Sequence, residues 1–220
     1  MTNSIANISQ RKAAIVVGIG LIISFILAFF VDDFILSNFI RPGDSATLAS
    51  DIKANEMLFH IAVAVFLIIL ACDAAIALAL YVILKPANKS LASLTAVLRL
   101  AYVLIMVISV LALVFQFIDV YSYVTIELWF GYIFFTFHLF VAGYSVFKSG
   151  YIPRGLGVLL IIASFCYPIP FYVNFLLPEA ILLIFMLCMV IGEISIGLWL
   201  LLKSAKLHVM IEEKMNTSEE

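Results

Sequence analysis

Charged residues are scarce in this chain of 220 residues: only 12% are Asp, Glu, Lys or Arg, whereas 65% are hydrophobic. Soluble domains carry about 25% charged residues. A soluble fold could not bury so much apolar surface, and the surface left over would promote aggregation. Lipid removes that difficulty, so the composition predicts an integral membrane protein with the bilayer as its main partner. The formal net charge of −2 gives no reason to expect nucleic acid as a partner.

Several common chemistries lack the residues that they need. The three cysteines all fall in apolar runs, so no disulfide framework is indicated. Three histidines at unmatched positions are too few for a typical zinc site or for a haem between two histidines. We therefore expect no metal and no cofactor. The sequence has no phosphate-binding glycine loop, no Gly-x-Ser-x-Gly elbow and no visible inverted repeat.

Long apolar runs are what the sequence does have. A membrane-spanning helix needs about 20 apolar residues, and six such runs predict an all-α bundle of six transmembrane helices in one domain, residues 1–206. The expected helices cover about 13–31, 57–84, 91–118, 124–147, 155–172 and 178–202. Pro168 and Pro170 should kink or end the fifth helix. The polar tail, 207–220, is expected to be frayed.

Two smaller features concern loops and packing. The longest loop, 32–56, should turn at Arg41-Pro42-Gly43-Asp44, and its second part, 45–56, is compatible with a short surface helix. Small residues recur every fourth position at Ala71, Ala75 and Ala79, which favours a close helix–helix contact along that face.

Lysine and arginine give the expected orientation. Nine of them fall on one side of the membrane when the expected helices alternate in direction, and only Arg41 and Lys53 fall on the other. Because cytoplasmic loops are enriched in these residues, both termini should be cytoplasmic in a multi-pass protein of the plasma (inner) membrane. The nine are Arg11, Lys12, Lys85, Lys89, Lys148, Arg154, Lys203, Lys206 and Lys214.

Four ionisable residues lie inside the expected spans, where such residues are functional-site candidates. They are Asp73, Arg99, His138 and Glu193. Each lies ten to twelve residues from a lysine at the basic end of its helix, which corresponds to a common depth of roughly 15–18 Å. The second and third helices form a tight hairpin, so we expect an ion pair between Asp73 and Arg99. His60 and Tyr167 are secondary candidates.

The polar layer permits three interpretations. It could be a structural clasp in a non-catalytic membrane protein. Glu193 and His138 could instead serve a translocator of protons or small solutes. The same two residues could act as acid and base in an intramembrane enzyme for a lipid-like substrate. A small apolar or cationic ligand would suit the last two.

Particular segments also suggest a family. They are Pro42-Gly43-Asp44, Glu56, Leu58-Phe59, Asp73, Ala77-Leu78-Ala79-Leu80-Tyr81, Lys85-Pro86, Asn88, Arg99, His138, Lys148-Ser149-Gly150-Tyr151-Ile152-Pro153-Arg154, Leu156-Gly157, Tyr167, Gly192-Glu193 and Leu198-Trp199-Leu200-Leu201. In these segments the chain resembles a bacterial membrane family catalogued as domain of unknown function 4386. It departs in a short link between the third and fourth helices, and in His60 where the family suggests a basic residue. The resemblance implies a six-helix membrane protein and no particular activity.

Overall fold

The computed structural model describes residues 2–31, 54–172 and 176–217, and every regular element in these ranges is a helix. The expected turn at 41–44 and most of the expected surface helix at 45–56 lie outside the described residues. The elements are α1 (Thr2–Phe30), α3 (Glu56–Leu84), α4 (Lys89–Val114), α5 (Val120–Ile126), the π-helix η3 (Glu127–Gly131), α6 (Tyr132–Ser149), α7 (Arg154–Cys166), α8 (Pro168–Tyr172), α9 (Glu179–Lys203) and α10 (Leu207–Asn216).

Five stretches of the described chain are long and apolar enough to cross a membrane. They are Gln10–Phe30, Glu56–Leu84, Lys89–Val114, Trp129–Ser149 and Glu179–Lys203. The remaining expected span, the fifth at 155–172, corresponds to a shorter apolar stretch, Arg154–Pro170. At 1.5 Å per residue this stretch is about 25 Å long, a little less than the hydrocarbon core of about 30 Å.

The break near the end of the fifth expected span lies at its prolines. Helix α7 ends at Cys166, and the short helix α8 begins at Pro168. Proline has no backbone N–H and clashes with the preceding turn, so it is better placed in the first turn of a new helix than inside an old one. The predicted interruption is confirmed.

The boundary between the third and fourth expected helices was predicted inaccurately. Helix α4 ends at Val114 rather than near 118, because Gln116 adopts a left-handed conformation with φ 59°. The next helical run starts at Val120 and continues through η3 into α6. Asp119 precedes this run, and its carboxylate accepts a hydrogen bond from the Ser122 backbone N–H at 2.6 Å. That bond lowers the pKa of Asp119 and marks the helix start.

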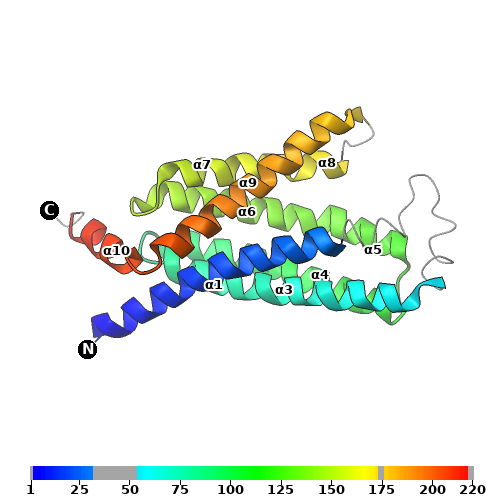
Figure 1. Cartoon of the computed structure of the whole chain (residues 1–220), viewed down its shortest axis with the longest axis horizontal. Coiled ribbons are helices and arrows are strands. Elements are labelled where there is room, and N and C mark those ends of the chain that lie inside the picture. The colour runs from blue at the N-terminus through cyan, green and yellow to red at the C-terminus, as the bar shows by residue number, and fades with distance from the viewer. Residues whose placement is uncertain (1, 32–53, 173–175, 218–220) are drawn as a thin grey trace.

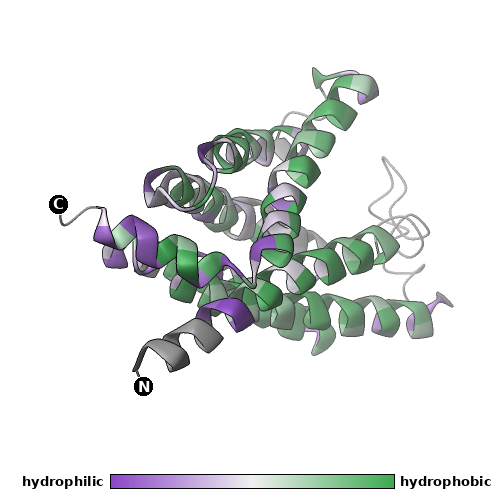
Figure 2. Ribbon diagram, turned by 60° about the vertical axis from the view of Figure 1, so that its left-hand side comes forward, coloured by the Kyte–Doolittle hydropathy of each residue, from purple (hydrophilic) through white to green (hydrophobic). Residues whose placement is uncertain are grey.

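The helices alternate in direction along the bundle (Figure 1). Consecutive long helices pack as antiparallel neighbours, α1 with α3, α3 with α4 and α6 with α7, and α9 packs on both α7 and α1. The described ends of the chain, α1 and α10, lie at the same end of the bundle (Figure 1). Figure 2 shows that hydrophobic residues cover most of the helix surfaces, while hydrophilic residues gather at the helix ends and on α10.

The C-terminal tail is not frayed, contrary to expectation, over residues 207–216. It forms α10, in which Leu207 and Ile211 are buried. Their spacing of four residues places them on one face of the helix, and they join the hydrophobic core that includes Tyr151 and Ile152. The prediction was wrong because polar residues dominate the composition of the tail. Leu207 and Ile211 nevertheless suffice to pack one face of α10 against the core.

Close helix contacts are made by glycines rather than by the alanines of α3. Ala71 and Ala75 are exposed, because each lies two residues from buried Asp73 and therefore about 200° around the helix. Instead, a Cβ on Gly143 of α6 would lie 2.7 Å from the carbonyl oxygen of Gly157 on α7. The expected alanine contact is therefore wrong for two of its three residues, and the backbones of α6 and α7 meet directly.

Candidate functional site

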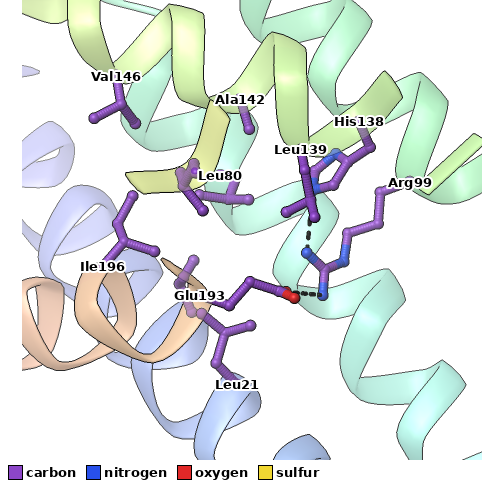
Figure 3. Close-up of a pocket in the computed structure, with 11 residues that line it drawn as sticks. Leu21, Leu80, Arg99, His138, Leu139, Ala142, Val146, Glu193 and Ile196 are labelled. Carbon is purple, nitrogen blue, oxygen red and sulfur yellow. Dashed lines mark hydrogen bonds and ion pairs between the residues drawn. The ribbon is translucent and has the colours of Figure 1, made fainter. Parts of the chain in front are cut away.

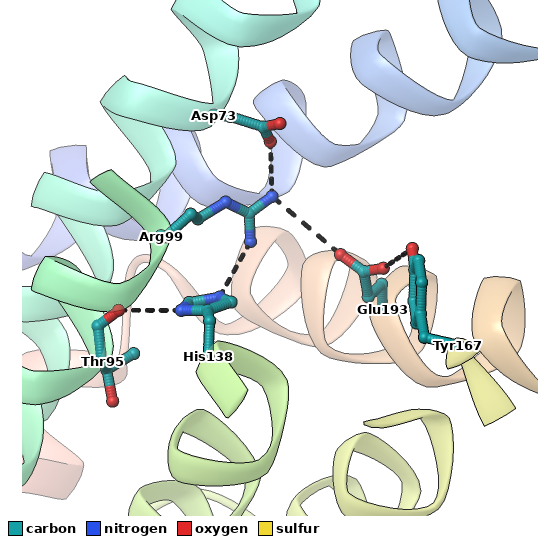
Figure 4. A network of polar contacts seen from close by, with 6 residues as sticks. All are labelled: Asp73, Thr95, Arg99, His138, Tyr167 and Glu193. Atoms are coloured by element: carbon teal, nitrogen blue, oxygen red, sulfur yellow. Dashed lines mark hydrogen bonds and ion pairs between the residues drawn. The ribbon is translucent and has the colours of Figure 1, made fainter. Parts of the chain in front are cut away.

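The four ionisable residues of the expected spans meet in one cluster. Asp73 on α3, Arg99 on α4, His138 on α6 and Glu193 on α9 are 5%, 2%, 1% and 3% exposed. Figure 4 shows their side chains converging from different helices, with Arg99 at the centre. The expectation of one polar layer, based on equal distances from the basic helix ends, agrees with this arrangement.

Arg99 and Asp73 form the predicted ion pair. The Nη2 group of Arg99 donates to Oδ1 of Asp73 at 2.5 Å. The local sequence explains why these residues meet. Lys85 follows the last residue of α3, and the Asn88 side chain caps α4 by accepting a hydrogen bond from the Leu91 N–H at 2.9 Å. This short turn fixes the register of the two antiparallel helices, so residues at equal distances from it face each other.

His138 uses both of its ring nitrogens within the cluster. Its Nδ1 lies 2.8 Å from the backbone oxygen of Thr95, and its Nε2 lies 3.1 Å from Nη1 of Arg99. A carbonyl oxygen only accepts and a guanidinium only donates. Nδ1 therefore carries the proton, Nε2 accepts, and the ring is a neutral imidazole in one tautomer. In this arrangement His138 links α6 to two turns of α4.

Glu193 has two neighbours in the cluster. The hydroxyl of Tyr167 donates to its Oε1 at 2.5 Å, and its Oε2 lies 4.0 Å from Nη2 of Arg99. Gly192, which precedes Glu193, lets α9 lie close to α7, because a Cβ at this position would lie 2.7 Å from the Cβ of Ala163 on α7. Tyr167, a secondary candidate from the sequence, is thereby part of the cluster.

An aromatic wall covers one side of the charged groups. The guanidinium carbon of Arg99 lies 5.1 Å from the ring centre of Phe135, a distance at which a cation is attracted to an aromatic face. The ring of Phe135 in turn contacts those of Tyr102 and Tyr167, with centroids 5.0 and 4.9 Å apart. The sequence analysis did not single out Phe135. Its position three residues before His138 is the signal that could have found it.

A small cavity adjoins the cluster (Figure 3). Arg99, His138 and Glu193 line one side, and the other side is apolar, with Leu21, Leu80, Leu139 and Ile196 among its residues. It leaves about 20 Å³ for the centre of a water-sized molecule, which is room for about one water. The Nε of Arg99 is buried and has no hydrogen-bond partner among the described residues.

Comparison with known proteins identifies the family. A family model described as "Domain of unknown function (DUF4386)" matches residues 16–118 and 112–204. The chain belongs to this family. A relative from Archaeoglobus fulgidus, described as an uncharacterized protein, is 34% identical over 152 residues, which are 68% of this chain and 86% of the relative. No solved structure matches this chain.

All four cluster residues of this DUF4386 protein lie within the matched ranges. The other secondary candidate, His60, is separate from them. It is exposed near the start of α3, and its Nδ1 lies 2.8 Å from the backbone oxygen of Glu56. Thirteen residues separate it from Asp73 along α3, a rise of about 20 Å. Among the described residues, no group of three or more His, Cys, Asp or Glu could hold a metal ion.

Proposed function

We propose that this DUF4386 protein is a structural or accessory protein of the bacterial plasma (inner) membrane, which it spans six times. Five long apolar helices and the shorter stretch Arg154–Pro170 support six passes, and an even number returns both ends of the chain to one side. The lysine and arginine residues near those ends support a cytoplasmic location for both.

The cluster around Arg99 serves in this proposal as a clamp between helices. The single observation that carries it is that Arg99 contacts three other helices at once, through Asp73 on α3, His138 on α6 and Glu193 on α9. Tyr167 extends the network to the end of α7. Polar contacts of this kind hold membrane helices in register, and an uncompensated charge left in the core is strongly destabilising.

The small cavity favours the clamp over the two functional alternatives. Room for about one water does not accommodate a lipid chain or a solute beside Glu193. His138, the expected acid or base, is held by Thr95 and Arg99. To exchange protons with a substrate it would first have to break one of these bonds.

A double-mutant cycle tests the clamp. Asp73→Asn, Arg99→Gln and the double variant would be unfolded by SDS titration in mixed micelles, with the exposed acid Glu179→Gln as a control on α9. We expect each single change to remove about 3–5 kcal/mol, because each leaves a buried charge without its partner. The double variant should lose less than the sum of the two by about 1–3 kcal/mol. Small, additive losses would contradict the clamp.

Glu193→Gln separates the clamp from a translocator. A clamp predicts lower stability and no change in proton permeability of proteoliposomes. Unchanged or raised stability together with a loss of proton flux would favour a residue retained for transport at the expense of stability. The same variant in a lipid-turnover assay tests the intramembrane enzyme.

A further inference from the structure

Two of the three cysteines lie against each other outside the Arg99 cluster. Cys166 is the last residue of α7 and is buried, and Cys188 lies half-buried on α9. Cys188 is the side chain that interacts with the Cys166 thiol. The third cysteine, Cys72, lies on α3.

The register of α7 and α9 explains this pairing. The helices run antiparallel, and their backbones approach closely where a Cβ on Gly192 would lie 2.7 Å from the Cβ of Ala163 and 3.0 Å from the backbone oxygen of Leu159. One turn further along, three residues after Ala163 on α7 and four residues before Gly192 on α9, the same two faces carry Cys166 and Cys188. Residues three and four apart share a helix face.

The backbone near Cys166 favours a covalent link. A disulfide needs Cα atoms about 4.4–6.8 Å apart and Cβ atoms directed toward each other. The glycine contact one turn away brings the two helices unusually close. The backbone N–H of Tyr167 still bonds to the oxygen of Ala163 at 3.0 Å, so the helical geometry keeps Cys166 on the same face of α7 as Ala163.

We propose that Cys166 and Cys188 are a redox modification site, at which a reversible disulfide ties the end of α7 to α9. Two S–H bonds break and one S–S bond forms. The two electrons and two protons pass to a lipid-soluble oxidant of the quinone class, which becomes the quinol. An oxidant of this class matches the apolar surroundings of both cysteines.

The link would act on the edge of the Arg99 cluster. Tyr167 follows Cys166 directly, and its hydroxyl donates to Glu193, five residues after Cys188. A disulfide therefore fixes the distance between the two helices that this hydrogen bond joins. The inference is independent of the proposed clamp, because the two cysteines lie on facing helices whether the charged cluster is structural or functional.

The test uses the full-length protein in detergent micelles with decylubiquinone as the oxidant. After denaturation, a maleimide–polyethylene glycol reagent counts free thiols by gel shift. We expect the number to fall from three to one, with one quinol formed per chain, and to return to three after dithiothreitol. Chymotrypsin, which cleaves after Tyr172 between the two cysteines, should release a linked peptide pair that separates on reduction.

Matched variants identify the partners. Cys72→Ala should leave no free thiol after oxidation, whereas Cys188→Ser should keep both of its thiols and form no quinol. The disulfide should also raise the apparent Tm, and dithiothreitol should reverse the rise. Three free thiols after oxidation, or a bond that joins Cys72 or two chains, would overturn the proposal.

Discussion

The two ends of the bundle are packed differently. We call the end with both chain termini the packed half and the opposite end the splayed half. Helix α9 shows the contrast: its buried residues are Gly192, Glu193, Ile196, Gly197 and Leu200, and none of residues 179–191 is buried. In Figure 1 the first part of α9 lies away from α1 and α3, and its last part approaches them near α10.

The charged cluster lies where this packing begins. Glu193 is the second buried residue of α9, and Arg99 and His138 lie at similar depth on α4 and α6. Beyond this level, residues such as Leu183 and Met186 are 56% and 52% exposed. Apolar side chains that would aggregate in water are stable against lipid, so a membrane-spanning helix can leave part of its length unpacked against its neighbours. The cluster gives α9 a specific contact with the other helices at the point where its own apolar packing ends.

Truncating one leucine in each half should give the largest contrast. Leu200→Ala removes a side chain that is 0% exposed in the packed half, and we expect a loss of about 2–5 kcal/mol from lost packing and the cavity left behind. Leu183→Ala in the splayed half, on the same helix, should change stability by less than about 0.5 kcal/mol. SDS titration of both variants measures the difference. Equal losses would mean that α9 is packed along its whole length.

Glycines provide a second contrast, within the packed half. A Cβ on Gly143 would lie 2.7 Å from the carbonyl oxygen of Gly157, so Gly143→Ala forces two backbones apart and should cost about 1–3 kcal/mol. Gly155→Ala is the matched control because no atom lies within 4 Å of its added Cβ. It should leave thermal stability unchanged or slightly raised, since alanine favours helix over glycine. A tolerated Gly143→Ala would contradict direct backbone contact.

A tyrosine links the helix ends of the packed half. The hydroxyl of Tyr151 donates to the backbone oxygen of Ile83 at 2.6 Å, and Tyr151→Phe should lose about 1 kcal/mol. Burial raises the pKa of Tyr151, so the folded state keeps the phenol proton longer than the unfolded state. This contribution is complete below the ordinary tyrosine pKa of about 10 and declines as pH rises above it. The difference in unfolding free energy between wild type and Tyr151→Phe should therefore narrow above about pH 10. A difference that stays constant with pH would contradict a contribution from the phenol proton.

The smallest effect is expected at the histidine of the splayed half. His60 is exposed, and its ring contacts only local groups among the described residues, the backbone oxygen of Glu56 and the ring of Phe59. His60→Ala should change stability by less than about 0.5 kcal/mol. The same change at buried His138 removes the acceptor of Arg99 Nη1. In the same SDS titration, the stability loss of His138→Ala should be clearly larger than that of His60→Ala. A large effect at His60 would indicate a role that its local contacts do not explain.

Much of the site could be predicted because its depth is encoded locally. Counting residues from the lysines at the helix ends placed four ionisable residues in one layer, since every helix rises by 1.5 Å per residue. The partner of Asp73 was also predictable, because the turn at residues 85–88 joins α3 directly to α4. The helix before this turn was therefore the neighbour in which the sequence predicted a partner for Arg99.

The remaining partners could not be derived in this way. The sequence placed His138 and Glu193 in the same layer without assigning their partners, and in the structure His138 bonds to Arg99 and Thr95, while Glu193 bonds to Tyr167. These contacts depend on the order of non-consecutive helices around the bundle, about which depth gives no information. The close contact predicted at the alanines of α3 was wrong for a related reason, because a face of small residues does not indicate which neighbouring helix it packs against.

The sequence by itself determined that most of the helices are long and apolar enough to cross a membrane, the approximate limits of these helices, and the common position of the four ionisable residues along them. These properties follow from composition, from the length of apolar runs and from the fixed rise of an α-helix. Only the tertiary structure decided which helices touch, through glycines such as Gly143, Gly157 and Gly192 that allow backbones to meet. It therefore also decided the tautomer of His138 and the partner of Glu193, because hydrogen bonds between distant segments depend on angles around the bundle as well as on depth within it.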